Sequence, residues 1–185
     1  MRIIAGKYKS RRISFPKNSK NSRIRRLPLR PTSDRARETL FDVLNNLIDF
    51  DGISCLDLFA GTGALGFEAL SRGASEAFFV DKSGINIDII NKSAQELGCH
   101  EQIALCKEEA AVYLNGDRTR FDLVFADPPY DYGSYPDLVK SVLRTKPQIF
   151  VLETSISEKQ NYKMIGYVTI VKQVGTAKFH IFSAK

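Results

Sequence analysis

Two spacings of hydrophobic residues alternate along the chain from about residue 33 onward. Short apolar runs, typical of buried strands, are separated by segments with apolar residues three and four positions apart, which are typical of amphipathic helices. Strands are expected at 53–58, 76–81, 103–106, 121–126 and 148–153, and helices at 33–47, 64–72, 85–97, 109–114 and 135–143. Residues 164–171 and 177–182 alternate in strand fashion around Gly175-Thr176, which predicts a closing hairpin.

Strands that alternate with helices predict an α/β fold, a Rossmann-like, mostly parallel doubly wound sheet, here with a C-terminal antiparallel hairpin. At 185 residues the chain is long enough for one well-packed domain, with little left for a second. The composition changes near residue 32. We therefore expect a basic N-terminal arm over 1–32 and the main domain over 33–185.

Several features argue for a cytoplasmic protein without a membrane partner. No apolar run approaches membrane-spanning length, and the first residues lack the apolar centre of a signal peptide. Cys55, Cys99 and Cys106 are odd in number and match no disulfide framework, so we expect them to be reduced. Cysteine and histidine meet only at Cys99-His100, which is a poor chelate, so no metal is expected.

The net charge of +6 is distributed unevenly. Residues 1–37 hold 13 Lys and Arg against one acid, Asp34, whereas the rest of the chain is net negative. A basic arm on a mildly acidic domain predicts a polyanionic partner, the alternative being a solvated, flexible terminus. Residues 2–4 and 12–15 are expected to form a small hairpin. Arg35 and Arg37 lie in the first turn of a helix, where a cation is unfavourable unless it meets phosphate.

A glycine-rich turn follows the first predicted strand. Gly61, Gly63 and Gly66 satisfy the pattern G-x-G-x-x-G, and Asp81 lies 20 residues after Gly61, where an acid that binds ribose is expected. This spacing fits NAD as well as S-adenosylmethionine. Asp57 favours the second cofactor, because a carboxylate repels a pyrophosphate but can anchor an ammonium group.

Acids are expected at the carboxyl ends of four strands: Asp57, Asp81, Glu108 or Glu109, and Asp127. Ligands of open α/β sheets bind at this edge. A row of acids suits a cationic cofactor such as S-adenosylmethionine and opposes a dianionic one.

The fourth strand runs directly into Asp127-Pro128-Pro129-Tyr130. Two prolines end a strand abruptly, which leaves a carboxylate, unpaired carbonyls and an aromatic ring at the end of the strand. Such groups suit an exocyclic amine on a flat ring, with acceptors for its N–H protons and a face for stacking. A purely structural turn of this composition is the alternative.

Longer segments resemble one family. Residues 57–74, 30–41 and 1–6 are similar to the bacterial 16S rRNA guanine-N2 methyltransferases of the RsmD type, and residues 127–130 are similar to the amino-methyltransferase motif. The resemblance implies the class I methyltransferase fold, S-adenosylmethionine as donor and S-adenosylhomocysteine as product. It also implies N2 of one guanine, guanine 966 of 16S rRNA within the small ribosomal subunit, as target, and a monomer is expected.

The resemblance further implies roles for individual residues, which fall into three groups. The target base is expected to meet Asp127, Pro128 and Tyr130. The donor is expected to contact Asp57, Phe59, Gly61, Thr62, Gly63, Asp81, Lys82, Glu109 and Ala110. The rRNA backbone is expected to contact Arg11, Arg12, Arg30, Arg35 and Arg37.

Three alternatives stay open. A DNA or RNA adenine-N6 methyltransferase, or a cytosine-N4 enzyme, shares both motifs but usually carries additional target-recognition sequence. An NAD-dependent oxidoreductase explains the glycine turn but neither Asp57 nor the Asp-Pro-Pro-Tyr segment. A non-catalytic RNA-binding module would not need the complete set of acids and glycines. Guanine rather than adenine as the target rests on the resemblance alone.

Overall fold

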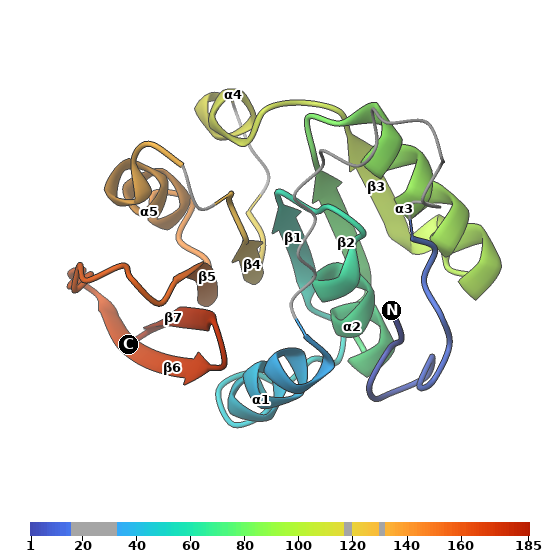
Figure 1. Cartoon of the computed structure of the whole chain (residues 1–185), viewed down its shortest axis with the longest axis horizontal. Coiled ribbons are helices and arrows are strands. Elements are labelled where there is room, and N and C mark those ends of the chain that lie inside the picture. Colours follow the sequence, from blue (N-terminus) through green and yellow to red (C-terminus); the bar gives the residue numbers. More distant parts are fainter. Residues whose placement is uncertain (16–32, 117–119, 130–131) are drawn as a thin grey trace.

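The computed structural model describes residues 1–15, 33–116, 120–129 and 132–185 (Figure 1). These residues form a seven-stranded sheet in the order β3-β2-β1-β4-β5-β7-β6. The strands are β1 (Ser54–Leu58), β2 (Glu76–Val80), β3 (Ile103–Cys106), β4 (Leu123–Ala126), β5 (Ile149–Ser155), β6 (Tyr167–Val174) and β7 (Ala177–Ala184).

The first five strands run parallel, and β7 lies antiparallel between β5 and β6. Strand β1 pairs with both β2 and β4, so the strand order reverses beside β1. The predicted mostly parallel doubly wound sheet is confirmed, as is the closing hairpin, in which Val174 pairs with Ala177. A reversal of strand order places a crevice at the carboxyl end of β1, and this is where a ligand is expected.

Helices cover both faces of the sheet, with α4 and α5 on one side and α1 and α2 on the other (Figure 1). Their bounds are α1 (Asp34–Leu44), α2 (Ala64–Arg72), α3 (Gly84–Leu97), α4 (Ala110–Asn115) and α5 (Tyr135–Leu143). Side chains alternate between the faces along each strand. Cys55 and Phe125 belong to the core that α1, α2 and α3 cover, whereas Leu56 and Val124 belong to the core under α4 and α5.

The first helix ends earlier than the pattern predicts. Its apolar stripe continues to Leu47, but the helix stops at Leu44 and is followed by a turn. The Asn46 side chain donates to the Asp42 carbonyl at 2.8 Å. Asparagine competes in this way with the helical hydrogen bonds of the backbone, and this accounts for the early end.

Residues 1–15 fold back onto the domain instead of extending from it. Arg2 and Arg12 form an antiparallel bridge, and Ile3, Tyr8 and Ile13 are buried in the same core as α1 and α2. The predicted small hairpin is thus reduced to one bridge with flanking hydrogen bonds. This part of the basic arm is a layer of the domain.

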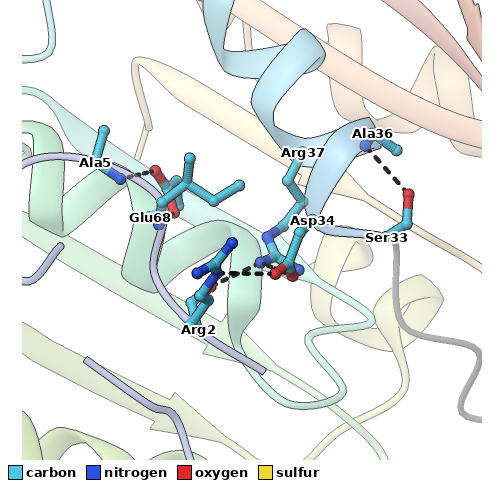
Figure 2. A network of polar contacts seen from close by, with 8 residues as sticks. Arg2, Ala5, Ser33, Asp34, Ala36, Arg37 and Glu68 are labelled. Atoms are coloured by element: carbon cyan, nitrogen blue, oxygen red, sulfur yellow. Dashed lines mark hydrogen bonds and ion pairs between the residues drawn. The ribbon is translucent and has the colours of Figure 1, made fainter. Parts of the chain in front are cut away.

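Two acids, the buried Glu68 and the exposed Asp34, fasten this segment (Figure 2). Glu68 of α2 is fully buried, accepts hydrogen bonds from the backbone N–H groups of Ile4 and Ala5, and pairs with Arg72 at 3.0 Å. At the start of α1, Asp34 pairs with Arg2 at 3.2 Å and with Arg37 at 2.9 Å. The N-terminal segment is therefore tied to both α1 and α2.

Within the described ranges, no helix is both long and apolar enough to traverse a bilayer.

Candidate active site at the carboxyl edge of the sheet

Four acids meet at the carboxyl edge of the sheet: Asp57, Asp81, Asp127 and Glu153. Each follows by two positions a buried strand residue of the core under α1, α2 and α3, so all four occupy the same face. Asp57, Asp81 and Glu153 are at most 8% exposed, and Asp127 is half-buried. The strands thus gather negative groups from four separate segments of the chain into one row.

The glycines after β1 permit a tight turn and a close helix. Gly61 and Gly63 have φ of +57° and +76°, values that L side chains rarely adopt, and Gly63 is the N-cap of α2 without a side-chain cap. A Cβ on Gly66 would collide with the Phe79 ring of β2. The third glycine therefore lets α2 approach the sheet, and the second leaves the positive N-terminus of α2 facing the edge.

The two acids beside this turn hold the loop itself. The Asp57 carboxylate accepts a hydrogen bond from Gly66 N at 3.1 Å. Asp81 accepts from Gly61 N and Ser83 N, both at 2.8 Å, and from the Asn86 side chain at 3.1 Å. The alternative role of Asp57 as a loop-bonding acid is therefore present in the structure, and it shapes the same turn that a cofactor would occupy.

Burial and mutual repulsion raise the pKa of two acids in this row. Burial raises the pKa of Asp57 to about 8, the hydrogen bond from Gly66 opposes this rise, and the charge of Asp81 adds to it. Burial also raises the pKa of Asp127 well above its ordinary value, with further increases from the charges of Glu153 and then Asp57. Accumulated negative charge of this kind favours a cation between the carboxylates.

Aromatic rings connect the turn after β1 with the segment after β4. Phe59 has φ of +61°, an uncommon conformation for a residue with a Cβ, and its ring meets Tyr132 edge-on at 5.4 Å. Tyr132 also contacts Tyr135 at the start of α5, with ring centroids 6.0 Å apart. These contacts bring the Gly61 turn and the Asp127 segment to one place.

The remaining residues expected to contact donor and base have varied surroundings. Thr62, Ala110 and Pro128 are buried, whereas Lys82 and Glu109 are exposed. Glu109 is the N-cap residue of α4, at the carboxyl end of β3. Tyr130 and Arg30 lie outside the described residues.

The arginines expected to bind RNA divide into two kinds. Arg11, Arg12 and Arg35 are exposed. Arg37 is 1% exposed, and its guanidinium binds Asp34 and the carbonyl of Arg2. An interior guanidinium with these partners cannot reach a phosphate, so the expected RNA contact at Arg37 is corrected to a structural role.

Two residues of this edge, Glu153 and Tyr132, were not identified from the sequence. Glu153 lies near the carboxyl end of β5 and carries the same signal as Asp57 and Asp127, an acid that follows a run of apolar strand residues. Tyr132 gave no signal beyond lying close to the Asp-Pro-Pro segment. Among the described residues, no group of three or more His, Cys, Asp or Glu could hold a metal ion, so the row of acids does not converge as a chelate.

The comparisons with known proteins agree with this geometry. A family model described as Conserved hypothetical protein 95 matches residues 1–183. The chain belongs to this family. Its strand order and its antiparallel β7 are those of the class I methyltransferase fold, as the structural comparison confirms.

One relative of this chain is the Ribosomal RNA small subunit methyltransferase D of Haemophilus influenzae. The two are 38% identical over 136 residues, which is 72% of this chain and 65% of that relative. The match therefore spans just under two thirds of the relative.

Among solved structures, the yhhF protein of Escherichia coli has a TM-score of 0.84 at 24% identity and covers 100% of this chain and 98% of that one. A protein solved in complex with SAH has a TM-score of 0.62 at 16% identity and covers 80% of this chain and 49% of the other. These likenesses establish the fold.

Proposed function

We propose that the protein transfers a methyl group from S-adenosylmethionine to N2 of a guanine in 16S rRNA of the small ribosomal subunit. One observation carries the proposal: a buried carboxylate, Asp57, lies beside an uncapped helix N-terminus in the same row as Asp127 of the Asp-Pro-Pro segment. The names of the relatives support rRNA as the substrate class. Guanine 966 is the position that the resemblance suggests.

The residues around the Gly61 turn suit S-adenosylmethionine in charge and in shape. The residues expected to bind the methyl donor offer carboxylates at Asp57 and Asp81 and backbone N–H groups at the start of α2. Asp57 would hold the ammonium group, and the N-terminus of α2 would hold the methionine carboxylate. Asp81 would exchange one of its loop hydrogen bonds for a ribose hydroxyl. The cofactor, when bound, supplies an electrophilic methyl group on a sulfonium.

Residues at the end of β4 would hold the acceptor base. A base must leave its stack before its exocyclic nitrogen can be approached in line, and an aromatic ring such as that of Tyr130 can stack on the extruded base. The Asp127 carboxylate and the Pro128 carbonyl would accept the two N2 protons. Acceptors placed in this way favour a pyramidal nitrogen whose lone pair faces the methyl group, so positioning and electrostatics supply most of the catalysis.

The exposed cations Arg2, Arg12 and Arg35 offer a surface for the rRNA backbone. Arg2 pairs with Asp34, the neighbour of Arg35, and bridges to Arg12, so the three lie close together. Such contacts fix orientation without reading sequence.

The test is transfer of labelled methyl from S-adenosylmethionine to small subunits of a strain that lacks this gene, followed by digestion to nucleosides. The proposal expects N2-methylguanosine from one rRNA position. N6-methyladenosine would establish the adenine alternative. No transfer to subunits, free rRNA or DNA, with the donor still bound, would overturn the enzymatic role.

A further inference from the structure

The ends of β4 and β5 bring two carboxylates side by side. The parallel register pairs Ala126 with Leu152, so the next residues along the two strands are Asp127 and Glu153. Neighbouring strands are about 4.8 Å apart. Both side chains occupy the face under α1, and after burial the charge of Glu153 is the largest cause of the raised pKa of Asp127.

The position of Glu153 is fixed by strands on both of its sides. Strand β5 lies between β4 and β7, and Glu153 pairs with Phe179 of β7. Glu153 is 4% exposed, whereas Asp127, in the next strand, is half-buried. Glu153 is therefore the more buried of the two neighbouring acids.

The Watson–Crick edge of guanine matches two neighbouring acceptors. Guanine carries an N1–H and an N2 amino group side by side, so this edge presents donors to both carboxylates. Adenine presents its amino group beside N1, and cytosine presents its amino group beside N3, and both of these ring nitrogens are acceptors. A carboxylate beside such an acceptor is repelled, whereas one beside N1–H forms a charge-assisted hydrogen bond.

We propose that Glu153 is the residue that selects guanine, with its carboxylate accepting N1–H of the target base while Asp127 accepts a proton of N2. This inference rests on the proposed function and adds a recognition role that the Asp-Pro-Pro segment alone lacks. Glu153 reads the ring nitrogen, and Asp127 orients the nitrogen that is methylated. Discrimination follows from the ring nitrogen, because N1–H of guanine donates to the carboxylate, whereas the lone pair on N1 of adenine or N3 of cytosine repels it.

The test uses 2-aminopurine, which keeps the amino group at C2 but has no hydrogen on N1. The substrates are two rRNAs, prepared by ligation and assembled into small subunits, that carry guanine or 2-aminopurine at the mapped position. The wild-type protein is expected to prefer guanine in kcat/KM by about 10- to 100-fold. In Glu153→Gln, whose amide can donate to N1, the preference is expected to fall to within about threefold.

Glu158→Gln is the matched control, because Glu158 lies in the loop after β5 and bonds Gln160 N. It is expected to keep the wild-type preference. Glu153→Asp keeps a shortened carboxylate and should retain part of the preference, so this variant and the wild-type ratio test the proposal even if Glu153→Gln does not fold. Donor affinity should stay within about twofold in every folded variant.

Two results would overturn the inference alone. One is an equal rate of the wild-type protein on both substrates. The other is an equal loss on both substrates in Glu153→Gln, which would reduce Glu153 to a structural role. A wild-type protein that transfers no methyl group to the guanine substrate would overturn the proposed function, and this inference with it.

Discussion

The carboxyl edge of the sheet has two halves that treat their acids differently. Beside β1 and β2, Asp57 and Asp81 accept hydrogen bonds from the backbone of the turn that they support. Beside β4 and β5, no described residue donates a hydrogen bond to the Asp127 carboxyl, and burial, with a further contribution from the charge of Glu153, raises its pKa. The donor half is already assembled by its own loop, whereas the Asp127 carboxyl of the acceptor half is left available to a substrate.

This difference assigns separate tasks to the two halves. Hydrogen bonds within the donor half preorganise a turn for a ligand that is present in every catalytic cycle. An acceptor such as the Asp127 carboxyl gains most when N–H donors arrive, which is the behaviour expected where binding energy serves selection. Substitutions in one half should therefore leave the other almost unchanged.

The largest expected effect is on the acceptor half. Asp127→Ala removes an acceptor for the N2 protons and should lower kcat by about 10²- to 10³-fold, the range seen when one oriented catalytic hydrogen bond is removed. Donor affinity, measured by calorimetry, should stay near the wild-type value. Asp137→Ala, at an exposed acid of the following helix, serves as control and should retain activity. A collapse of donor affinity in Asp127→Ala would contradict the division of tasks.

The donor half should respond to pH. With the pKa of Asp57 raised to about 8, this carboxyl is mostly protonated in the ligand-free protein below pH 7. A bound ammonium group favours the ionised form, so donor affinity should rise about tenfold from pH 6 to pH 7, with release of about one proton. Calorimetry in buffers of different ionisation enthalpy measures both quantities. Asp57→Asn should make the affinity weaker and independent of pH, and a pH-independent wild-type affinity would refute this role.

Crowding the donor turn should affect stability as well as binding. In Gly66→Ala, the new Cβ meets the Phe79 ring, so α2 must move away from the sheet, at a cost of about 1–3 kcal/mol in the free energy of unfolding. Donor affinity should fall with it, because Gly66 N donates the hydrogen bond that holds the Asp57 carboxylate. Gly133→Ala places its Cβ in open space and should leave both unchanged. Urea unfolding measures the difference, and equal stability of the two variants would show that α2 has room to adjust.

The smallest effect is expected on the basic surface, outside both halves. Arg35→Ala should weaken binding to small subunits a few-fold and reduce the slope of log affinity against log salt by about 1. Arg144→Ala removes an exposed cation at the end of α5, before β5 begins, and should change neither the affinity nor the slope. Binding titrations at several salt concentrations separate the two variants. A salt-independent wild-type affinity would remove the role of the basic surface.

The sequence predicted the elements well because each strand and helix is marked by its own apolar period. The expected helix over 64–72 has the observed bounds, since Gly63 and Gly73 flank it. The order of the strands in the sheet cannot be predicted from such a period. The insertion of β7 between β5 and β6 depends on contacts between distant segments, which no local period encodes.

The candidate site was predictable where one signal repeats. An acid at the carboxyl end of an apolar strand identified Asp57, Asp81 and Asp127, and the same rule applied once more would have identified Glu153. Arg37 was misjudged, because its position in a helical first turn gave no indication that Asp34 and the Arg2 carbonyl would enclose it. Burial of a charged side chain depends on segments that the helix does not contain.

The docking of residues 1–15 has a consequence for the order in which the protein is built. This segment leaves the ribosome well before the residues that hold it: Glu68 lies 64 positions after Ile4, and Glu96 lies 85 positions after Arg11. Contacts this distant along the chain form slowly, because a long loop must close first. Residues 1–15 therefore cannot dock until α2 and α3 have been synthesised, and their cations stay without these partners until then.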